Sequence, residues 1–269
     1  MIEAAAPGYR SLFIPTWTVP SWERGLGILD SRRGGATLAL TAMNLRLMER
    51  LSATPNVFVL NAARWFETVG AAAVNARAWY LGNRAVTRAA LAEAARDIRA
   101  ALGALSTGPR SLLILDLDDT LWGGLVGKGW KGLELGGLEG TGKAYVDFQT
   151  AIKDLKRRGV SLGIVSKNLE SAALDAIRSH PAMILRETDF AGWKINRKDM
   201  ASNIRELAME LDVALGSVVF IDDNPSERAR VREAMPEVYV PDWPKDVLLY
   251  PSALRSLRCF DAPLLQPTP

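Results

Sequence analysis

The strongest signal in the chain is residues 112–124, which read Leu112-Leu-Ile-Leu-Asp-Leu-Asp-Asp-Thr-Leu-Trp-Gly-Gly124. The branched apolar run at 112–115 predicts a buried strand, and it ends at Asp116, Asp118 and Asp119. Side chains alternate along a strand, so Asp116 and Asp118 are expected to point the same way. Like charges at the end of a buried strand cost free energy unless a cation lies between them. The stretch therefore predicts a bound cation; the alternative is an Asp-rich turn in which Asp and Thr cap a helix.

The composition narrows the class of protein. The 269 residues suffice for one large domain or two small ones, with 48% hydrophobic and 23% charged residues. A net charge of +3 without a dense Lys/Arg stripe argues against nucleic-acid binding. No apolar run approaches about 18 residues, so we expect no membrane span. A single cysteine, Cys259, fits a reducing cytoplasm, and a single histidine, His180, excludes multi-His metal sites.

A turn-forming stretch, Ser-Thr-Gly-Pro-Arg at 106–110, predicts a linker. It separates a smaller α/β segment at 1–105 from a larger domain at 111–260, and a Pro-rich tail follows at 261–269. In the first segment we expect helices at 36–50 and 86–105 and a strand at 57–60.

After the linker the pattern alternates between strand and helix. The expected strands are 112–116, 160–165, 182–185, 217–221 and 237–240, and the expected helices are 142–158, 170–179, 200–212 and 225–234. Such alternation predicts an α/β fold, a Rossmann-like parallel sheet with helices on both faces. Sites in such folds form beyond the carboxyl ends of the strands.

Polar side chains follow three of these strands. Asp116 and Asp118 follow the first, Ser166, Lys167 and Asn168 the second, and Asp222 and Asp223 the fourth. The next residues, Asn224-Pro-Ser-Glu227, form a good helix start, with Asn at the N-cap and Glu three residues on. Asn224 and Glu227 therefore need no catalytic role, whereas the two aspartates are left unexplained by capping.

Phosphoryl transfer through an aspartyl phosphate requires such a set of groups. Mg²⁺ prefers a few carboxylates together with water and a substrate phosphate. Asp116 can serve as ligand and nucleophile, and Asp118 as acid and then base. Ser166 and backbone N–H groups at a helix start can hold phosphate oxygens. A lysine usually neutralises the charge that builds up in the transition state.

The pattern resembles the haloacid dehalogenase (HAD) superfamily, and within it the FkbH-like branch. The resemblance is carried by Leu115-Asp-Leu-Asp-Asp-Thr-Leu-Trp-Gly-Gly-Leu-Val-Gly127, Ser166-Lys-Asn168, Phe220-Ile-Asp-Asp-Asn-Pro-Ser-Glu-Arg228 and Leu249-Tyr-Pro251. Residues 11–105 also resemble the partial hydrolase-like region that precedes the HAD domain in that family. They contain no histidine, so we expect a structural or docking module, with Trp17, Trp22, Arg24 and Trp65 as candidate contacts.

The resemblance implies a mechanism and a substrate. It implies Asp116 as nucleophile, Asp118 as acid and base, and Mg²⁺ held by Asp116, Asp118 (through its carbonyl) and Asp222, with Asp223 near. Thr120, Ser166, Lys167 and Asn168 are the expected substrate-binding residues. FkbH-like proteins take a glyceryl unit from 1,3-bisphosphoglycerate, remove phosphate and load the unit onto an acyl carrier protein for polyketide assembly. No large cap is expected, because only 125–141 is available as a flap.

Two positions depart from the family pattern. Val165 stands where the family commonly has a Cys that is a plausible acceptor for a thioester. Met200 stands where the family has a Lys, and Lys198, which we expect to be catalytic, or Lys194 would have to replace it. Three readings follow: an FkbH-like glyceryl transferase and phosphatase, a phosphatase alone acting on a small metabolite or carrier-bound phosphate, and a degenerate, non-catalytic binding module.

Overall fold

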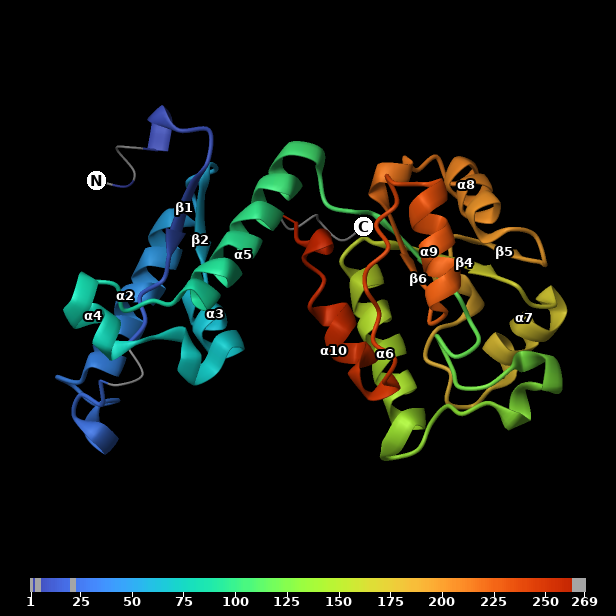
Figure 1. The fold of residues 1–269 in the computed structure, drawn as a ribbon, viewed down its shortest axis with the longest axis horizontal. Coiled ribbons are helices and arrows are strands. Elements are labelled where there is room, and N and C mark those ends of the chain that lie inside the picture. The colour runs from blue at the N-terminus through green and yellow to red at the C-terminus, as the bar shows by residue number, and fades with distance from the viewer. Residues whose placement is uncertain (1, 3–5, 20–22, 263–269) are drawn as a thin grey trace. The chain divides into compact units, whose positions relative to one another are not determined.

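A computed structural model of the chain describes all residues except 1, 3–5, 20–22 and 263–269 (Figure 1). The chain divides into two compact units, Met1–Leu102 and Gly103–Pro269. Trp22 and most of the expected tail lie outside the described residues. Among the described residues, no helix combines the length and hydropathy that crossing a membrane requires.

The first unit is built on a small parallel sheet. Its strands β1 (Leu12–Pro15) and β2 (Val57–Leu60) pair in register, which confirms the strand expected at 57–60. Its helices are α2 (Ala36–Leu51), α3 (Ala62–Val69), α4 (Ala76–Gly82) and most of α5 (Arg88–Thr107), whose last turn belongs to the second unit. Helix α5 continues to Thr107, so the first two residues of the expected linker are helical. The small apolar core consists of Ala6, Leu51 and Val57.

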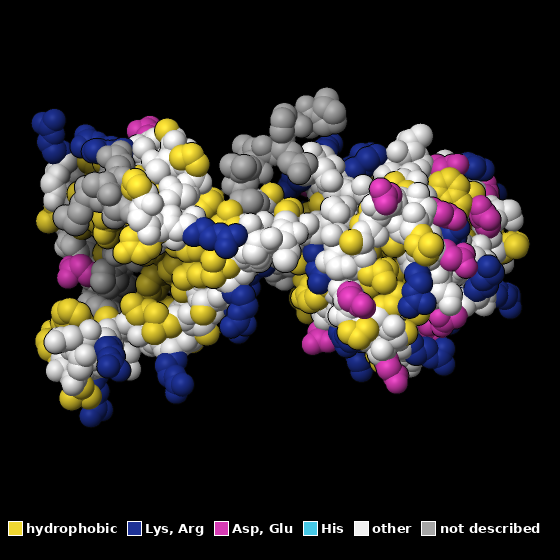
Figure 2. All heavy atoms as spheres, turned by 90° about the horizontal axis from the view of Figure 1, so that it is seen from above, with side chains coloured by type: hydrophobic (Ala, Val, Ile, Leu, Met, Phe, Trp, Pro, Cys, Tyr) yellow, Lys and Arg dark blue, Asp and Glu magenta, His cyan; other side chains and the backbone are white. Residues whose placement is uncertain are grey.

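The residues expected to contact a partner differ in exposure. Trp17 is 45% exposed and Arg24 is exposed. Trp65 is half-buried and its Nε1 donates to Asp97 Oδ2 at 2.6 Å, so it has a structural contact within the unit. Figure 2 shows apolar side chains and basic side chains interspersed on the visible face of this unit. A docking role for the first unit stays a prediction.

The second unit is a four-stranded parallel sheet in the order β5-β4-β3-β6, which confirms the expected fold class. The strands are β3 (Leu112–Leu115), β4 (Ser161–Ser166), β5 (Gly192–Ile195) and β6 (Val218–Ile221). Strand β3 lies at the centre, with Leu115 opposite Ile164 of β4 and Ile221 of β6. The ends of β3 and β6 therefore lie at one level of the sheet, and β4 continues two residues further, to Ser166.

Helices cover both faces of this sheet. Alternate residues of β3 point to opposite faces, so they pack against different helices. Leu113 and Leu115 belong to an apolar cluster with residues of α6, α7 and α10, whereas Leu112 and Ile114 pack with residues of α8 and α9. The helices are α6 (Gly140–Arg157), α7 (Glu170–Ser179), α8 (Met200–Glu210), α9 (Pro225–Ala234) and α10 (Tyr250–Arg255). Figure 1 shows α6 beside α10.

Two expected strands are wrong. Residues 182–185 form a loop, because the backbone N–H groups of Ile184 and Leu185 donate to the side chain of Gln149 at 2.9 and 3.3 Å rather than to a strand. Strand β5 at Gly192–Ile195 takes the edge position instead. At 237–240 there is only an isolated bridge between Val219 and Tyr239.

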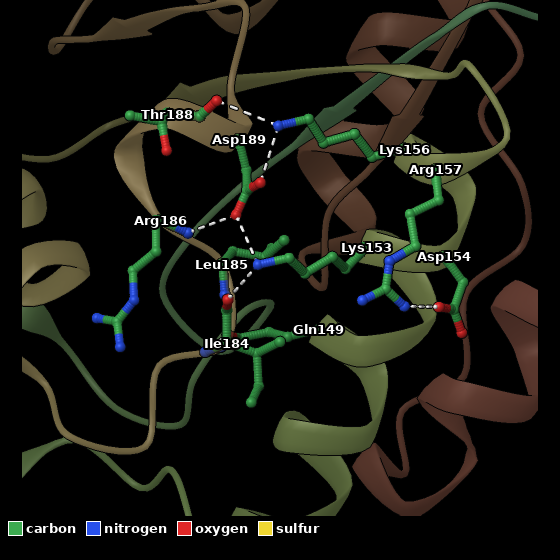
Figure 3. Close-up of polar contacts among 10 residues, drawn as sticks. All are labelled: Gln149, Lys153, Asp154, Lys156, Arg157, Ile184, Leu185, Arg186, Thr188 and Asp189. Atoms are coloured by element: carbon green, nitrogen blue, oxygen red, sulfur yellow. Dashed lines mark hydrogen bonds and ion pairs between the residues drawn. The ribbon is translucent and has the colours of Figure 1, made fainter. Parts of the chain in front are cut away.

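A polar network fixes the loop that replaces the expected strand. Asp189 accepts from Lys156 Nζ at 2.8 Å and pairs with Lys153 Nζ at 3.2 Å, and Lys153 also donates to the carbonyl of Ile184 (Figure 3). The apolar side chain of Leu185 is fully buried, which explains the strand-like sequence pattern. The apolar residues of this stretch are there because their side chains are buried, and not because the backbone pairs as a strand.

The segment between β3 and α6 forms no inserted domain. It contains two short 3-10 helices, Val126–Lys128 and Trp130–Gly132, and a bridge between Gly123 and Glu134. This confirms that the unit has no large cap.

Candidate active site

The site lies where β3, β4 and β6 end together. Asp116 follows β3, Ser166 is the last residue of β4, and Asp222 follows β6. The register places Asp116 beside Asp222, with Ser166 one residue further along β4, and the Asp116 N–H donates to the Ile221 carbonyl at 3.0 Å. The parallel sheet therefore brings together residues that are far apart in sequence, as predicted.

Three carboxylates converge at this edge. Asp116, Asp222 and Asp223 each offer an oxygen, and these oxygens lie within 4.8 Å of one another. Asp222 is 1% exposed, whereas Asp116 and Asp223 are half-buried. The donors are all oxygen, which is the ligand type that Mg²⁺ prefers, so the residues present fit a Mg²⁺ ion.

Burial makes these carboxylates poor acids. It raises the pKa of Asp116 well above its usual value, and the charge of Asp222 adds to that increase. Burial also raises the pKa of Asp222 to about 7. It raises the pKa of Asp223 as well, and the charge of Asp119 adds to that increase. Three ionised carboxylates this close repel one another, so a divalent cation is the natural way to keep them ionised near neutral pH.

The Asp118 carboxylate is not part of this cluster. Its Oδ1 accepts from Trp122 Nε1 at 2.9 Å and from the Val126 N–H at 3.1 Å. Trp122 is fully buried, so the indole holds the carboxylate in one place. This geometry suits a proton-transfer group; metal binding through the Asp118 carbonyl stays a prediction.

The turn after β3 is held in a strained conformation. Asp119 has φ +55°, in the left-handed region, and its Oδ1 accepts from the Gly124 N–H at 2.7 Å. Its carbonyl accepts from the hydroxyls of Tyr145 and Tyr250, each at 3.3 Å. Burial raises the pKa of Tyr250 to about 12, so this hydroxyl stays a donor. The two tyrosines were missed, since neither lies near a motif in sequence.

Thr120 joins the first and last motifs. Its Oγ1 accepts from the Asp223 N–H at 3.1 Å and donates to Asp223 Oδ1 at 3.4 Å. Thr120 is fully buried, so the structure gives it a contact with the loop after β6. A direct contact with substrate stays a prediction for this residue.

The residues after β4 divide into two groups. Ser166 hydrogen-bonds the Asp116 carboxylate, and its Oγ accepts from Asn168 Nδ2 at 3.1 Å. Lys167 instead donates from Nζ to Glu227 Oε1 at 2.7 Å. Ser166 therefore contacts Asp116 and Asn168 supports Ser166, whereas the Lys167 ammonium binds Glu227 of α9.

The helix start after β6 differs in one respect from the expected one. Asn224 is the N-cap, as predicted, and its side chain accepts from the Ser226 N–H at 2.9 Å. The Glu227 side chain, however, binds Lys167. Arg228 was also missed: its Nη1 donates to the carbonyls of Asp222 at 2.7 Å and Asp223 at 2.6 Å, and it is 8% exposed. A lone arginine directly after a capping sequence gives no signal of this role.

Neither lysine expected to replace the family lysine is placed at the carboxylates. Lys198 Nζ lies 3.8 Å from Glu206 of α8, and its side chain is 65% exposed. Lys194 pairs with Glu210 at the far end of the same helix. A catalytic role for Lys198 therefore stays a prediction.

The two departures from the family pattern share one apolar cluster. Val165 and Met200 are both buried, and both belong to the cluster that α8 and α9 form against the sheet. Neither position therefore supplies a thiol or an ammonium. These two residues act in packing.

The fold and the carboxylate cluster define a phosphatase domain of the HAD type. No family model matches the chain, and no curated protein matches it. A solved structure does match: the N-terminal part of the protein BF1531 from Bacteroides fragilis, which contains a phosphatase domain and was crystallised in complex with Mg. The two are 31% identical with a TM-score of 0.87, and the match covers 94% of this chain and 68% of that one. The chain belongs to the same family of HAD-type phosphatase-domain proteins.

Proposed function

We propose that the chain is a Mg²⁺-dependent phosphohydrolase of the FkbH-like branch that forms an aspartyl phosphate on Asp116. The convergence of Asp116, Asp222 and Asp223 within 4.8 Å carries the proposal. The similarity to a phosphatase domain crystallised with Mg supports it. Asp116, Asp222 and the Asp118 carbonyl would hold the ion, with Asp223 near, and the bound ion would orient the phosphoryl group and neutralise its charge.

The side chains divide the reaction into two displacements. In the first, an Asp116 oxygen attacks phosphorus, the bond from phosphorus to the leaving oxygen breaks, and Asp118 gives that oxygen a proton. In the second, Asp118 takes a proton from water, and the water oxygen attacks the phosphorus of the aspartyl phosphate. Phosphate leaves and the Asp116 carboxylate is regenerated. Asp118 is held by Trp122 and Val126 in both steps.

The proposed substrate is a glyceryl phosphate donor, 1,3-bisphosphoglycerate, and the proposed partner is an acyl carrier protein. The chain has one thiol, Cys259, whose pKa burial raises to about 12, and Val165 replaces the family cysteine. The carrier's own thiol would therefore attack the C1 acyl carbon, losing its proton to solvent, so that a thioester forms as inorganic phosphate leaves from C1. The two displacements at Asp116 would then remove the phosphate at C3, which leaves a glyceryl unit on the carrier.

A second candidate is a phosphatase without acyl transfer, acting on a small metabolite or a carrier-bound phosphate. The buried Val165 favours it, because the strand end offers no thiol.

Incubation of the full chain with Mg²⁺, 1,3-bisphosphoglycerate and candidate carrier proteins, followed by mass spectrometry of the carrier, separates the two. The glyceryl-transfer proposal predicts a glyceryl mass gain on the carrier together with phosphate release. Phosphate release that Asp116→Asn abolishes, without any carrier modification, selects the second candidate. If neither phosphate release nor carrier modification depends on Asp116, both are wrong.

A further inference from the structure

An ion pair spans the carboxyl end of β3. Lys167 follows β4 directly, and Glu227 is the third residue of α9, the helix that follows β6. Strands β4 and β6 flank β3 on either side. The 2.7 Å contact between Lys167 Nζ and Glu227 Oε1 therefore crosses the carboxyl end of β3, which Asp116 follows directly.

Glu227 is placed where its own charge is unfavourable. Its side chain is only 14% exposed, and its Oε2 is buried without a hydrogen-bond partner among the described residues. Its charge also contributes to the raised pKa of Asp222, so it lies near the carboxylate cluster. A further carboxylate beside three others is destabilising unless it holds something that the site requires. Its shortest ion pair is with the Lys167 ammonium.

Among the other basic groups near this edge, Arg230 is the one that shares Glu227: its Nη1 lies 3.6 Å from Glu227 Oε1, but its side chain is 65% exposed and comes from the same helix. The remaining basic groups have different contacts. Arg228 donates to the backbone carbonyls of Asp222 and Asp223 and so supports the loop. Lys194 and Lys198 pair with glutamates of α8. Lys167, with a side chain 37% exposed, is both tied across the site and open to a ligand.

We propose that Lys167 is the catalytic cation of this site, and that Glu227 is a positioning residue that holds its ammonium over Asp116. This rests on the phosphohydrolase function proposed above. As phosphorus moves from the leaving oxygen to Asp116, the ammonium stays protonated and stabilises the negative charge on the phosphoryl oxygens. Lys167 thereby takes the role that a lysine has in the family pattern at the position where this chain has Met200.

The test uses the full chain with Mg²⁺ and two readouts: steady-state hydrolysis of small phosphate monoesters, and Mg²⁺-dependent binding of beryllium fluoride, a mimic of the aspartyl phosphate. Lys167→Ala is expected to lower kcat by about 10²–10³-fold. It is also expected to weaken beryllium fluoride binding by about tenfold or more, while Lys167→Arg restores part of both. The matched control is Lys156→Ala, which removes a lysine paired with Asp189 beyond the amino end of β4 and should leave both readouts unchanged.

Glu227 is tested in a double-mutant cycle. Glu227→Gln is expected to lower kcat by about tenfold in the wild-type background and to have no further effect in Lys167→Ala. A purely structural role for Glu227 would instead produce the same loss in both backgrounds, and would overturn the positioning claim.

The failures are distinguishable. If the wild type hydrolyses phosphate esters and Lys167→Ala matches it in kcat and in beryllium fluoride binding, the inference is wrong and the proposed function stands. If neither the wild type nor any variant turns over or binds beryllium fluoride with Mg²⁺, the proposed function fails and the inference with it.

Discussion

Asp116 and Asp222 leave neighbouring parallel strands at the same level, because Leu115 of β3 lies opposite Ile221 of β6. Both carboxylates face the same edge, and burial raises the pKa of each. Sheet register, rather than loop conformation, therefore sets their separation. A site built on strand ends is held more rigidly than one built on loops.

Mg²⁺ is expected to stabilise the protein, and to do so more at higher pH. A carboxyl whose pKa is raised on folding contributes stability at low pH, and that stability is lost as pH rises through the folded pKa. For Asp222 this loss falls between about pH 4 and pH 7. Saturating Mg²⁺ should add about 3 kcal/mol at pH 8, an increase in Tm of about 5–10 °C, and less at pH 5. Thermal unfolding with and without Mg²⁺ at matched ionic strength measures this, and an unchanged Tm at pH 8 would contradict the metal site. Asp222→Asn should remove the response.

The indole of Trp122 is expected to set the position of Asp118. Trp122→Phe keeps a buried aromatic ring but removes the donor 2.9 Å from Asp118 Oδ1. We expect kcat to fall by about 10- to 100-fold with a smaller change in KM, since proton transfer depends on orientation. The control is Trp193→Phe, which removes an indole hydrogen bond to Glu170 on the surface. Equal rates in the two variants would show that Asp118 needs no anchor.

Gln149 is expected to be a large contributor to stability. Its fully buried amide donates to the Leu121 carbonyl at 2.8 Å and accepts from two N–H groups of the loop that contains Ile184 (Figure 3). Gln149→Ala leaves these groups without partners and should cost about 3 kcal/mol. Urea unfolding measures the loss. Thr150→Ala, which removes a hydroxyl bond to the Val146 carbonyl in the same helix, should cost less than about 1 kcal/mol, and similar losses for both would refute the assignment.

Asp30 is expected to make the first unit acid-sensitive. Its carboxylate accepts from Thr37 Oγ1 and from the N–H groups of Thr37, Leu26 and Ala36, and these bonds lower its pKa to about 2. Stability from a lowered pKa is present above about pH 4 and is lost as pH falls toward about 2. Asp30→Asn should lower the melting temperature at pH 7 and flatten its dependence on pH below 4. Glu49→Gln, on an exposed position of α2, is the control. An unchanged pH profile in Asp30→Asn would contradict the role.

The sequence predicted the strand ends well because each signal is local. Strands β3, β4 and β6 are apolar runs, and the groups that gather at the site follow them within a few residues. Strand β5 was missed because Gly192-Trp-Lys-Ile195 is an edge strand without such a run. The apolar stretch at 182–185 gives a strand-like signal, but its burial is achieved by a loop bound to Gln149.

The supporting residues were not predictable in the same way. Tyr250 meets Asp119 across 131 residues of chain, and nothing near Tyr250 in sequence marks that contact. The Glu227 side chain was expected to cap the start of its own helix, because capping depends on neighbouring residues in the sequence. In the structure it binds Lys167, which is far away in the sequence. The sequence did contain one signal for this pair: a basic residue follows β4 and an acidic residue follows β6, and these two strands flank β3.

The central claim is that Asp116 accepts a phosphoryl group. It is tested most directly by incubating the protein with Mg²⁺ and a phosphorylated substrate, quenching with borohydride, and sequencing the peptides by mass spectrometry. An aspartyl phosphate is reduced to homoserine, so the account predicts homoserine at position 116 in the wild type, none in Asp116→Asn, and no phosphate release by that variant. Phosphate release by the wild type with position 116 unmodified, or continued turnover by Asp116→Asn, would contradict it.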